Sequence, residues 1–160
     1  MDTYEWLLVF HVTGAFLMLG GGIIAATLNF AAARRNRRPS EVAFLFGLIR
    51  IAVVPIVLGA LLAFVFGLWL VHEAPFGYSY GDGWVITAVV LLILSSAMGS
   101  IGGRRDEQTA KFARELAERG DEPSEELLSR VRNPVALALS YGSGVLLIAI
   151  LAIMMWKPGA

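Results

Sequence analysis

The side chain best suited to chemistry in this sequence is a histidine that stands in an apolar stretch. His11 lies in FHVTGAFLMLGGG, residues 10–22. An imidazole in hydrocarbon needs a polar partner, a cavity or a ligand. Its helical neighbours at three, seven and eleven positions are Gly14, Met18 and Gly22, so this face should point into a bundle and leave space for a flat macrocycle. The alternative is a hydrogen bond from His11 to a serine or carbonyl group of a neighbouring helix.

Three further residues are candidates for the same site. Histidine with a thioether suits Cu(I) or haem iron, which makes Met18 a candidate partner of His11, although methionine in a helix usually only packs. His72 is a second candidate metal ligand, but it is expected at the membrane boundary, some 7–8 Å shallower than His11, where water or Glu73 would be its partner. Arg50 would either pair with a ligand carboxylate, such as a haem propionate, or snorkel to the surface. The candidate cofactor-binding residues are therefore His11, Met18, Gly22, His72 and Arg50, with His11 and His72 as metal ligands.

Several kinds of chemistry are excluded by what the sequence lacks. It has no cysteine, so disulfides and thiolate metal sites are ruled out. It has no glycine-rich phosphate loop followed by lysine, no convincing serine partner for either histidine and no row of intramembrane acids. These absences leave open whether the protein is an enzyme.

The composition indicates that the helices that position these residues span a membrane. The 160 residues are 57% hydrophobic and 16% charged, whereas soluble domains are nearer 45–50% and 25%. Apolar runs long enough to span a bilayer cover residues 5–33, 43–72, 84–103 and 134–156. Runs of this length are helical in lipid. The sequence predicts one all-α domain, residues 1–160, that forms a four-helix membrane bundle with a helical loop at 104–133, Ser124 and Asn133 as helix caps and Pro134 as a first helical residue.

The basic residues predict the orientation of the bundle. All but one of the 13 lysines and arginines fall at one end of the predicted helices, and the exception is Lys157. The positive-inside rule places that end in the cytoplasm and both termini outside, in the inner (plasma) membrane. Acidic and basic residues nearly balance in the loop 104–133, which argues against a strong patch for nucleic acid or anionic lipid within this loop. Four tryptophans occupy the outer helix ends and are expected to form an interfacial belt: Trp6, Trp69, Trp84 and Trp156.

Small residues spaced by four predict close helix packing. The second run has Gly59, Ala63 and Gly67, and the third has Ser95, Gly99 and Gly103. This pattern fits packing inside one chain as well as association into a homo-oligomer or with other membrane subunits.

The segment HVTGAFLMLGGG resembles the first-helix histidine motif of bacterial membrane proteins allied to the CopD copper-resistance domain and to HemJ, a protoporphyrinogen-oxidase-type protein. The plan of four helices with a basic cytoplasmic side is also similar to a large uncharacterised family of predicted four-helix integral membrane proteins. The HemJ resemblance implies haem b on His11. The chain has no intramembrane lysine, and this departure from the HemJ pattern concerns the oxidase activity rather than haem binding. The CopD resemblance implies copper instead.

Three functions remain open from the sequence. The first is a membrane protein that binds haem b through His11 in or beside a redox system, with membrane lipid around it. The second is a non-catalytic structural or assembly subunit without a cofactor, whose histidines are structural. The third is a copper-handling protein.

Overall fold

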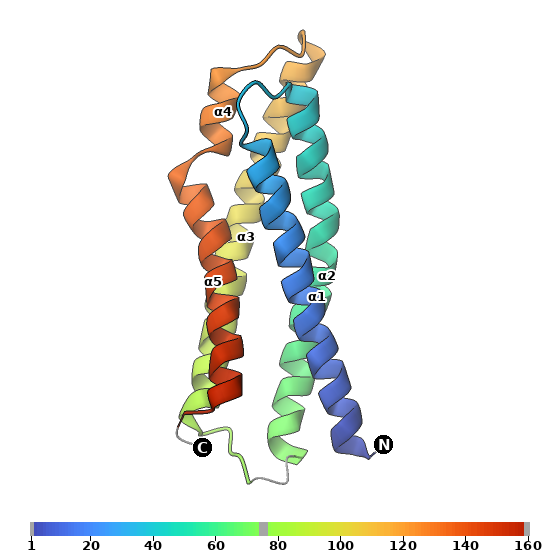
Figure 1. The fold of residues 1–160 in the computed structure, drawn as a ribbon, viewed down its shortest axis with the longest axis vertical. Coiled ribbons are helices and arrows are strands. Elements are labelled where there is room, and N and C mark those ends of the chain that lie inside the picture. Colours follow the sequence, from blue (N-terminus) through green and yellow to red (C-terminus); the bar gives the residue numbers. More distant parts are fainter. Residues whose placement is uncertain (1, 74–76, 159–160) are drawn as a thin grey trace.

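The computed structural model describes residues 2–73 and 77–158 and consists of helices joined by short connections (Figure 1). Four helices are long and apolar enough to cross a membrane, counting α4 and α5 as one span, which confirms the predicted all-α membrane bundle. The elements are α1 (Thr3–Ala32), α2 (Pro39–Glu73), α3 (Gly83–Glu118), α4 (Glu125–Val131) and α5 (Pro134–Trp156).

The third membrane helix is longer than its apolar run. Residues 104–118, predicted as the start of a loop, continue α3 as a polar extension. The sequence there contains no helix breaker, and Glu107 pairs with Lys111 one turn on at 3.3 Å. The helix ends where Gly120 and Asp121 adopt positive φ angles of 145° and 54°. The helical character predicted for the loop 104–133 is therefore confirmed in its first half, but the helix there continues the third membrane helix without a break.

The helix starts follow local capping rules. Asp2 and Glu5 form a reciprocal capping box at the start of α1. The Ser124 side chain accepts a hydrogen bond from the Leu127 N–H and begins α4. Asn133 caps α5 ahead of Pro134, so both caps predicted from the sequence are confirmed.

The long helices form two antiparallel pairs. α1 packs along α2 and α3 packs along α5, whereas α1 and α5 touch only sparsely (Figure 1). The start of α1 and the end of α5 share one end of the bundle, called here the terminal end. The opposite end carries the arginine-rich connection after α1, the α3 extension and α4, and is called the basic end. Both termini therefore lie on one side, as predicted, while the assignment of the basic end to the cytoplasm stays a prediction from charge.

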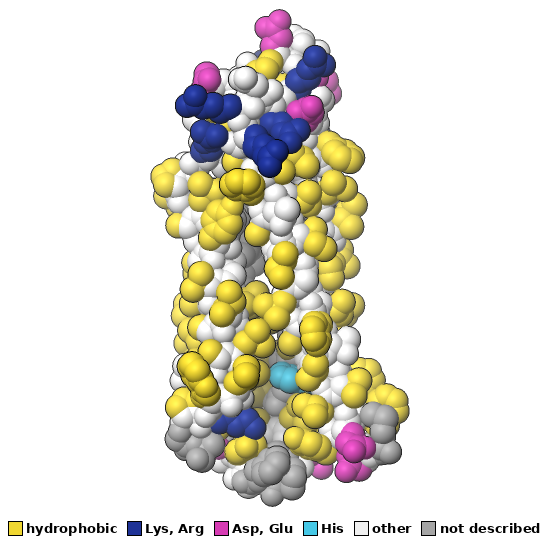
Figure 2. Space-filling view, in the orientation of Figure 1, with side chains coloured by type: hydrophobic (Ala, Val, Ile, Leu, Met, Phe, Trp, Pro, Cys, Tyr) yellow, Lys and Arg dark blue, Asp and Glu magenta, His cyan; other side chains and the backbone are white. Residues whose placement is uncertain are grey.

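The bundle surface between these ends is apolar. Figure 2 shows hydrophobic side chains over the middle of the molecule and a large cluster of basic residues at one end. Phe16 on α1, Ile51 on α2 and Val145 on α5 are 72%, 68% and 64% exposed. A soluble monomer does not expose so large an apolar surface, so this band is the face that lipid covers.

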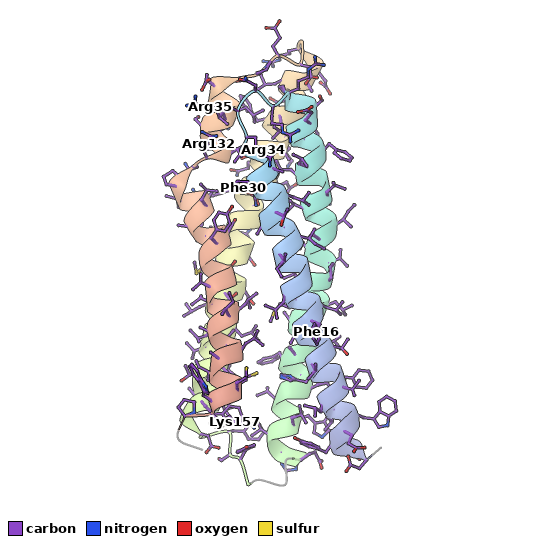
Figure 3. The ribbon with its side chains drawn as sticks, viewed as in Figure 1. Phe16, Phe30, Arg34, Arg35, Arg132 and Lys157 are labelled. Atoms are coloured by element: carbon purple, nitrogen blue, oxygen red, sulfur yellow. The ribbon has the colours of Figure 1, made fainter. Side chains whose placement is uncertain are left out.

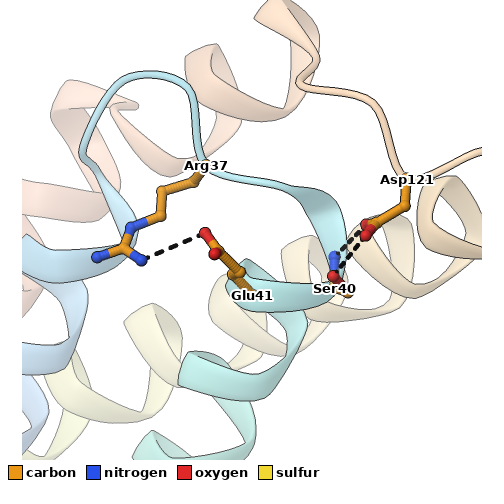
Figure 4. A network of polar contacts seen from close by, with 4 residues as sticks. All are labelled: Arg37, Ser40, Glu41 and Asp121. Carbon is orange, nitrogen blue, oxygen red and sulfur yellow. Dashed lines mark hydrogen bonds and ion pairs between the residues drawn. The ribbon is translucent and has the colours of Figure 1, made fainter.

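The basic end is held together by a small core of its own. Buried apolar side chains from α1, α2, the α3 extension and α4 meet there, namely Ala32, Val42, Phe46, Ile49, Ala110, Ala113, Leu127 and Val131. Two polar contacts lie over this core (Figure 4). Arg37 pairs with Glu41 at 3.2 Å, and the Asp121 carboxylate accepts hydrogen bonds from the Ser40 N–H and hydroxyl, both at 2.7 Å. The second contact ties the end of α3 to the start of α2.

The contact between Asp121 and Ser40 should make the stability of this end depend on pH. The Ser40 hydroxyl, then its N–H and the charge of Arg38, hold the pKa of Asp121 below its usual value. The contribution of this contact to the free energy of unfolding is complete above about pH 3.9, the usual pKa of an aspartate in an unfolded chain. It is lost as the pH falls through the lower pKa of Asp121 in the folded protein. We expect Asp121→Asn, which tolerates the positive φ, to lower the melting temperature slightly at neutral pH. Thermal unfolding in detergent should show this difference shrinking below about pH 4, and a difference that stays constant with pH would contradict this role.

The tryptophan belt is only partly as predicted. Trp6, Trp69 and Trp156 are exposed at the terminal end, but Trp84 is 7% exposed. The Tyr78 ring packs edge-on against Trp84 with centroids 5.2 Å apart, and the Lys157 amine lies 5.6 Å from the centre of the Trp84 ring. Trp84 therefore belongs to the core of the terminal end rather than to the interface.

Candidate functional site

His11 lies between α1 and α2 and is held there by the backbone of α2. Its Nδ1 is 2.8 Å from the carbonyl oxygen of Ala63. Gly67, one turn further along α2, makes room for the ring, because a Cβ at this position would lie 2.9 Å from both Cε1 and Nδ1 of His11. The imidazole is thus seated in a slot that the small residues of α2 create.

The direction of this hydrogen bond fixes the chemistry of the ring. A carbonyl oxygen only accepts, so Nδ1 must carry the hydrogen and Nε2 must carry the lone pair when the ring is neutral. No residue in the described part of the chain hydrogen-bonds Nε2. A histidine whose Nδ1–H is bound to a backbone carbonyl and whose Nε2 is open has the arrangement common to metal-ligating histidines.

The glycine-rich face of α1 is filled by α2. A Cβ on Gly14 would lie 2.6 Å from the Ala63 nitrogen, and a Cβ on Gly59 would lie 2.5 Å from the Gly14 oxygen. Gly21 likewise faces Ala52 and Ile56, whereas a Cβ on Gly22 would meet nothing within 4 Å. The space expected behind His11 for a macrocycle is therefore closed, and the glycine that joins this contact is Gly21 rather than Gly22.

α3 packs against α5 through small residues, but only some of them are the ones predicted from a spacing of four. The Ser95 hydroxyl donates to the Ser143 carbonyl at 3.0 Å, so Ser95 takes part in helix packing, as predicted, and its partner is α5. Gly102 lies against Ser140, while Gly99 and Gly103 face open space. The predicted four-residue spacing on α3 is thus correct only at Ser95, because a helix of 3.6 residues per turn drifts away from a strict spacing of four.

Met18 is a core residue and does not share a centre with His11. It is 6% exposed and clusters with Ala88 of α3 and with Leu147 and Ile150 of α5. It lies seven residues from His11, which is about 10 Å along the helix. One metal ion cannot bind both side chains at that separation.

Met154 is the thioether at the depth of His11. α1 and α5 are antiparallel, and Met18 meets Leu147 in one cluster. His11 lies seven residues, or nearly two full turns, from Met18 toward the terminal end, on the same face of its helix. Met154 lies the same number of residues from Leu147 in the same direction. His11 and Met154 are therefore at about the same depth. Met154 is partly buried against the same cluster. The depth of Met154 relative to His11 could not be predicted from the sequence, because the register between helices is not encoded in either helix alone.

The other two candidates lie far from His11. Ala63 marks the level of His11 on α2, and Arg50 is thirteen residues, or about 20 Å, toward the basic end. A propionate of a haem on His11 would not reach it, and Arg50 is exposed. His72 is nine residues from Ala63, about 14 Å away and on the opposite face of α2. The structure therefore does not bring His11 and His72 together, and in the described residues no three His, Asp or Glu side chains form a group that could hold a metal ion.

The slot at Gly67 can be tested without any ligand. We expect Gly67→Ala to displace the imidazole and break its bond to Ala63, since the new methyl group would sit 2.9 Å from the ring. The chain has only two histidines, so labelling them with ¹⁵N gives one reporter at the slot and one internal control at His72. The ring signals of His11 should shift while those of His72 stay. Unchanged His11 signals would mean that α2 does not hold the ring.

The comparisons with known proteins give a family and nothing more specific. Neither the curated proteins nor the solved structures contain a match to this chain. The model of one protein family matches residues 5–158, which include His11 and all of the four membrane-spanning segments except the first two residues of α1. The chain therefore belongs to the DUF2269 family of predicted integral membrane proteins.

Proposed function

We propose that this protein binds haem b in the membrane and that Nε2 of His11 would hold the iron. The observation that carries the proposal is the seating of the ring, in which Ala63 takes the Nδ1 hydrogen and leaves Nε2 open. Since the α2 side of His11 is closed by glycine packing, the cofactor would approach from the side that faces α5. The contact between α1 and α5 is sparse, so a ligand on this side would displace little packing between these two helices.

The donor set supports a haem or a copper ion. Imidazole with a thioether suits haem iron and also suits Cu(I), and Met154 is the thioether at the right depth. Bound haem would supply one-electron chemistry, and an apolar surround of the kind found here influences its potential. The first helix resembles HemJ-type proteins, which implies haem, and equally the CopD domain, which implies copper, so haem is the first candidate and copper the alternative to test. His11 would hold the iron and α2 would orient the ring, in a protein of the inner membrane that works beside a redox partner.

A second candidate function is a structural subunit without a cofactor. The observation that favours it is the same hydrogen bond, because a histidine tied to a carbonyl of the next helix already has a polar partner in lipid. On this alternative, the seam of Gly14, Gly59 and Gly21 makes a rigid hairpin. The exposed apolar faces would then bind a second copy or other membrane subunits.

An absorption spectrum with metal analysis on the same sample separates these functions. The protein should be expressed with ample haem precursor and copper, purified in mild detergent and measured oxidised and dithionite-reduced. Haem binding predicts a Soret band and stoichiometric iron. Stoichiometric copper without a Soret band would show that the protein binds copper and not haem. A colourless protein without either metal would support the structural function.

A further inference from the structure

A second site lies at the basic end, in a groove between α1 and α5. The groove has a volume of about 460 Å³, and its walls are largely apolar. Its lining residues are Phe30, Ala33, Arg34, Arg132, Leu137 and Tyr141. It opens where the apolar band of the bundle meets the arginines, which is the depth at which lipid headgroups lie (Figures 2 and 3).

Two arginines from distant parts of the sequence meet at the mouth of this groove. Arg34 follows the end of α1, and its guanidinium lies 6.0 Å from the centre of the Phe30 ring. Arg132 precedes α5, and its Nε donates to the Ala33 carbonyl at 2.8 Å, which fixes the side chain against the end of α1. Figure 3 shows both beside Arg35 and above Phe30. The fold thus concentrates positive charge above an apolar groove.

Within residues 2–73 and 77–158, no acidic side chain pairs with these two arginines. Arg37 pairs with Glu41 and Arg130 pairs with Glu126, so each of these neighbours has its own acid. Among the residues that the structure describes, neither Arg34 nor Arg132 has an ion pair. Arginine presents a planar set of donors that matches phosphate oxygens.

We infer that this groove binds one anionic phospholipid. Its phosphate would lie between Arg34 and Arg132, and one acyl chain would follow Phe30 and Leu137 down the groove. Tyr141 also lines the groove, on a helix that begins at the basic end, so its side chain leans toward that end. Its hydroxyl is available to the glycerol esters. A zwitterionic lipid fits less well because its own cation opposes the arginines. Basic pockets between membrane helices recognise anionic headgroups in this way.

The test measures retained lipid by native mass spectrometry of protein from micelles doped with phosphatidylglycerol or phosphatidylcholine. We expect one phosphatidylglycerol to be retained in preference to phosphatidylcholine. Arg34→Gln should weaken retention about fivefold, the effect of one charge at such a surface. Arg114→Gln, which removes the same charge from the exposed α3 extension, is the matched control and should bind like the wild type.

Two further arms separate a built site from general attraction to a charged surface. Leu137→Trp fills the groove and leaves every charge, so it should also reduce retention. Glycerophosphoglycerol, the headgroup without chains, should compete weakly. Equal losses in Arg34→Gln and Arg114→Gln, full retention in Leu137→Trp, or full competition by the headgroup alone would each overturn the proposal. Arg132→Gln is the secondary variant, because it also removes the bond to Ala33.

Discussion

Gly59→Ala should destabilise the bundle more than any other single methyl group added to α2. The new Cβ would lie 2.5 Å from the Gly14 oxygen and 2.6 Å from the Met18 nitrogen, so it meets the backbone of α1 rather than flexible side-chain ends. α1 and α2 can relieve this overlap only by moving apart along their whole contact. Overpacking of this kind costs about 1–3 kcal/mol. Thermal unfolding in detergent, followed by circular dichroism, should show the lower melting temperature.

Gly47→Ala is the matched control for this prediction. It lies on the same helix, and a Cβ at this position would meet nothing within 4 Å. Because alanine is the better helix former, this variant should be neutral or more stable by about 0.5–1 kcal/mol. If the two variants had equal stability, the close contact between α1 and α2 would be wrong.

His11→Ala should abolish bound haem, and this is the second large effect. The variant removes the proposed ligand and also the hydrogen bond to Ala63, whose loss costs about 0.5–2 kcal/mol between membrane helices. The matched control is His72→Ala, which removes an exposed histidine about 14 Å along α2 from the level of His11. Iron content and the Soret band should vanish in the first variant and persist in the second. If the Soret band were lost equally from both variants, a specific ligand role for His11 would be contradicted.

Much of the fold could be predicted from the sequence because each part has a local cause. Apolar length identifies the membrane helices, and Asn133 with Pro134 identifies a helix start without knowledge of any neighbour. The sequence predicted residues 104–118 as helical but as part of a connecting loop, and it did not show that they continue α3 without a break. Polarity indicates where a helix leaves the lipid and does not indicate where it ends.

The candidate site was predictable only in part, since it depends on register between helices. Helical spacing correctly placed His11, Gly14 and Met18 on the buried side of α1. Helical spacing selected Gly22, whereas the residue that contacts α2 is Gly21. Adjacent residues differ by about 100° around the helix axis, and the sequence does not show which side of α1 is covered by α2. The bond to Ala63 and the depth of Met154 need the packed structure. Arg50 and His72 were grouped with His11 by residue type, and the fold separates them.

Imidazole rescue of His11→Gly tests most directly whether Nε2 of His11 is a ligand. Glycine removes the ring and leaves a space in which free imidazole can bind both the iron and the Ala63 carbonyl. We predict that His11→Gly purified with haem lacks the low-spin Soret spectrum of the wild type and regains it as imidazole is added. A His11→Gly protein whose spectrum matches the wild type without imidazole, or a wild type that takes up no haem, would contradict the account.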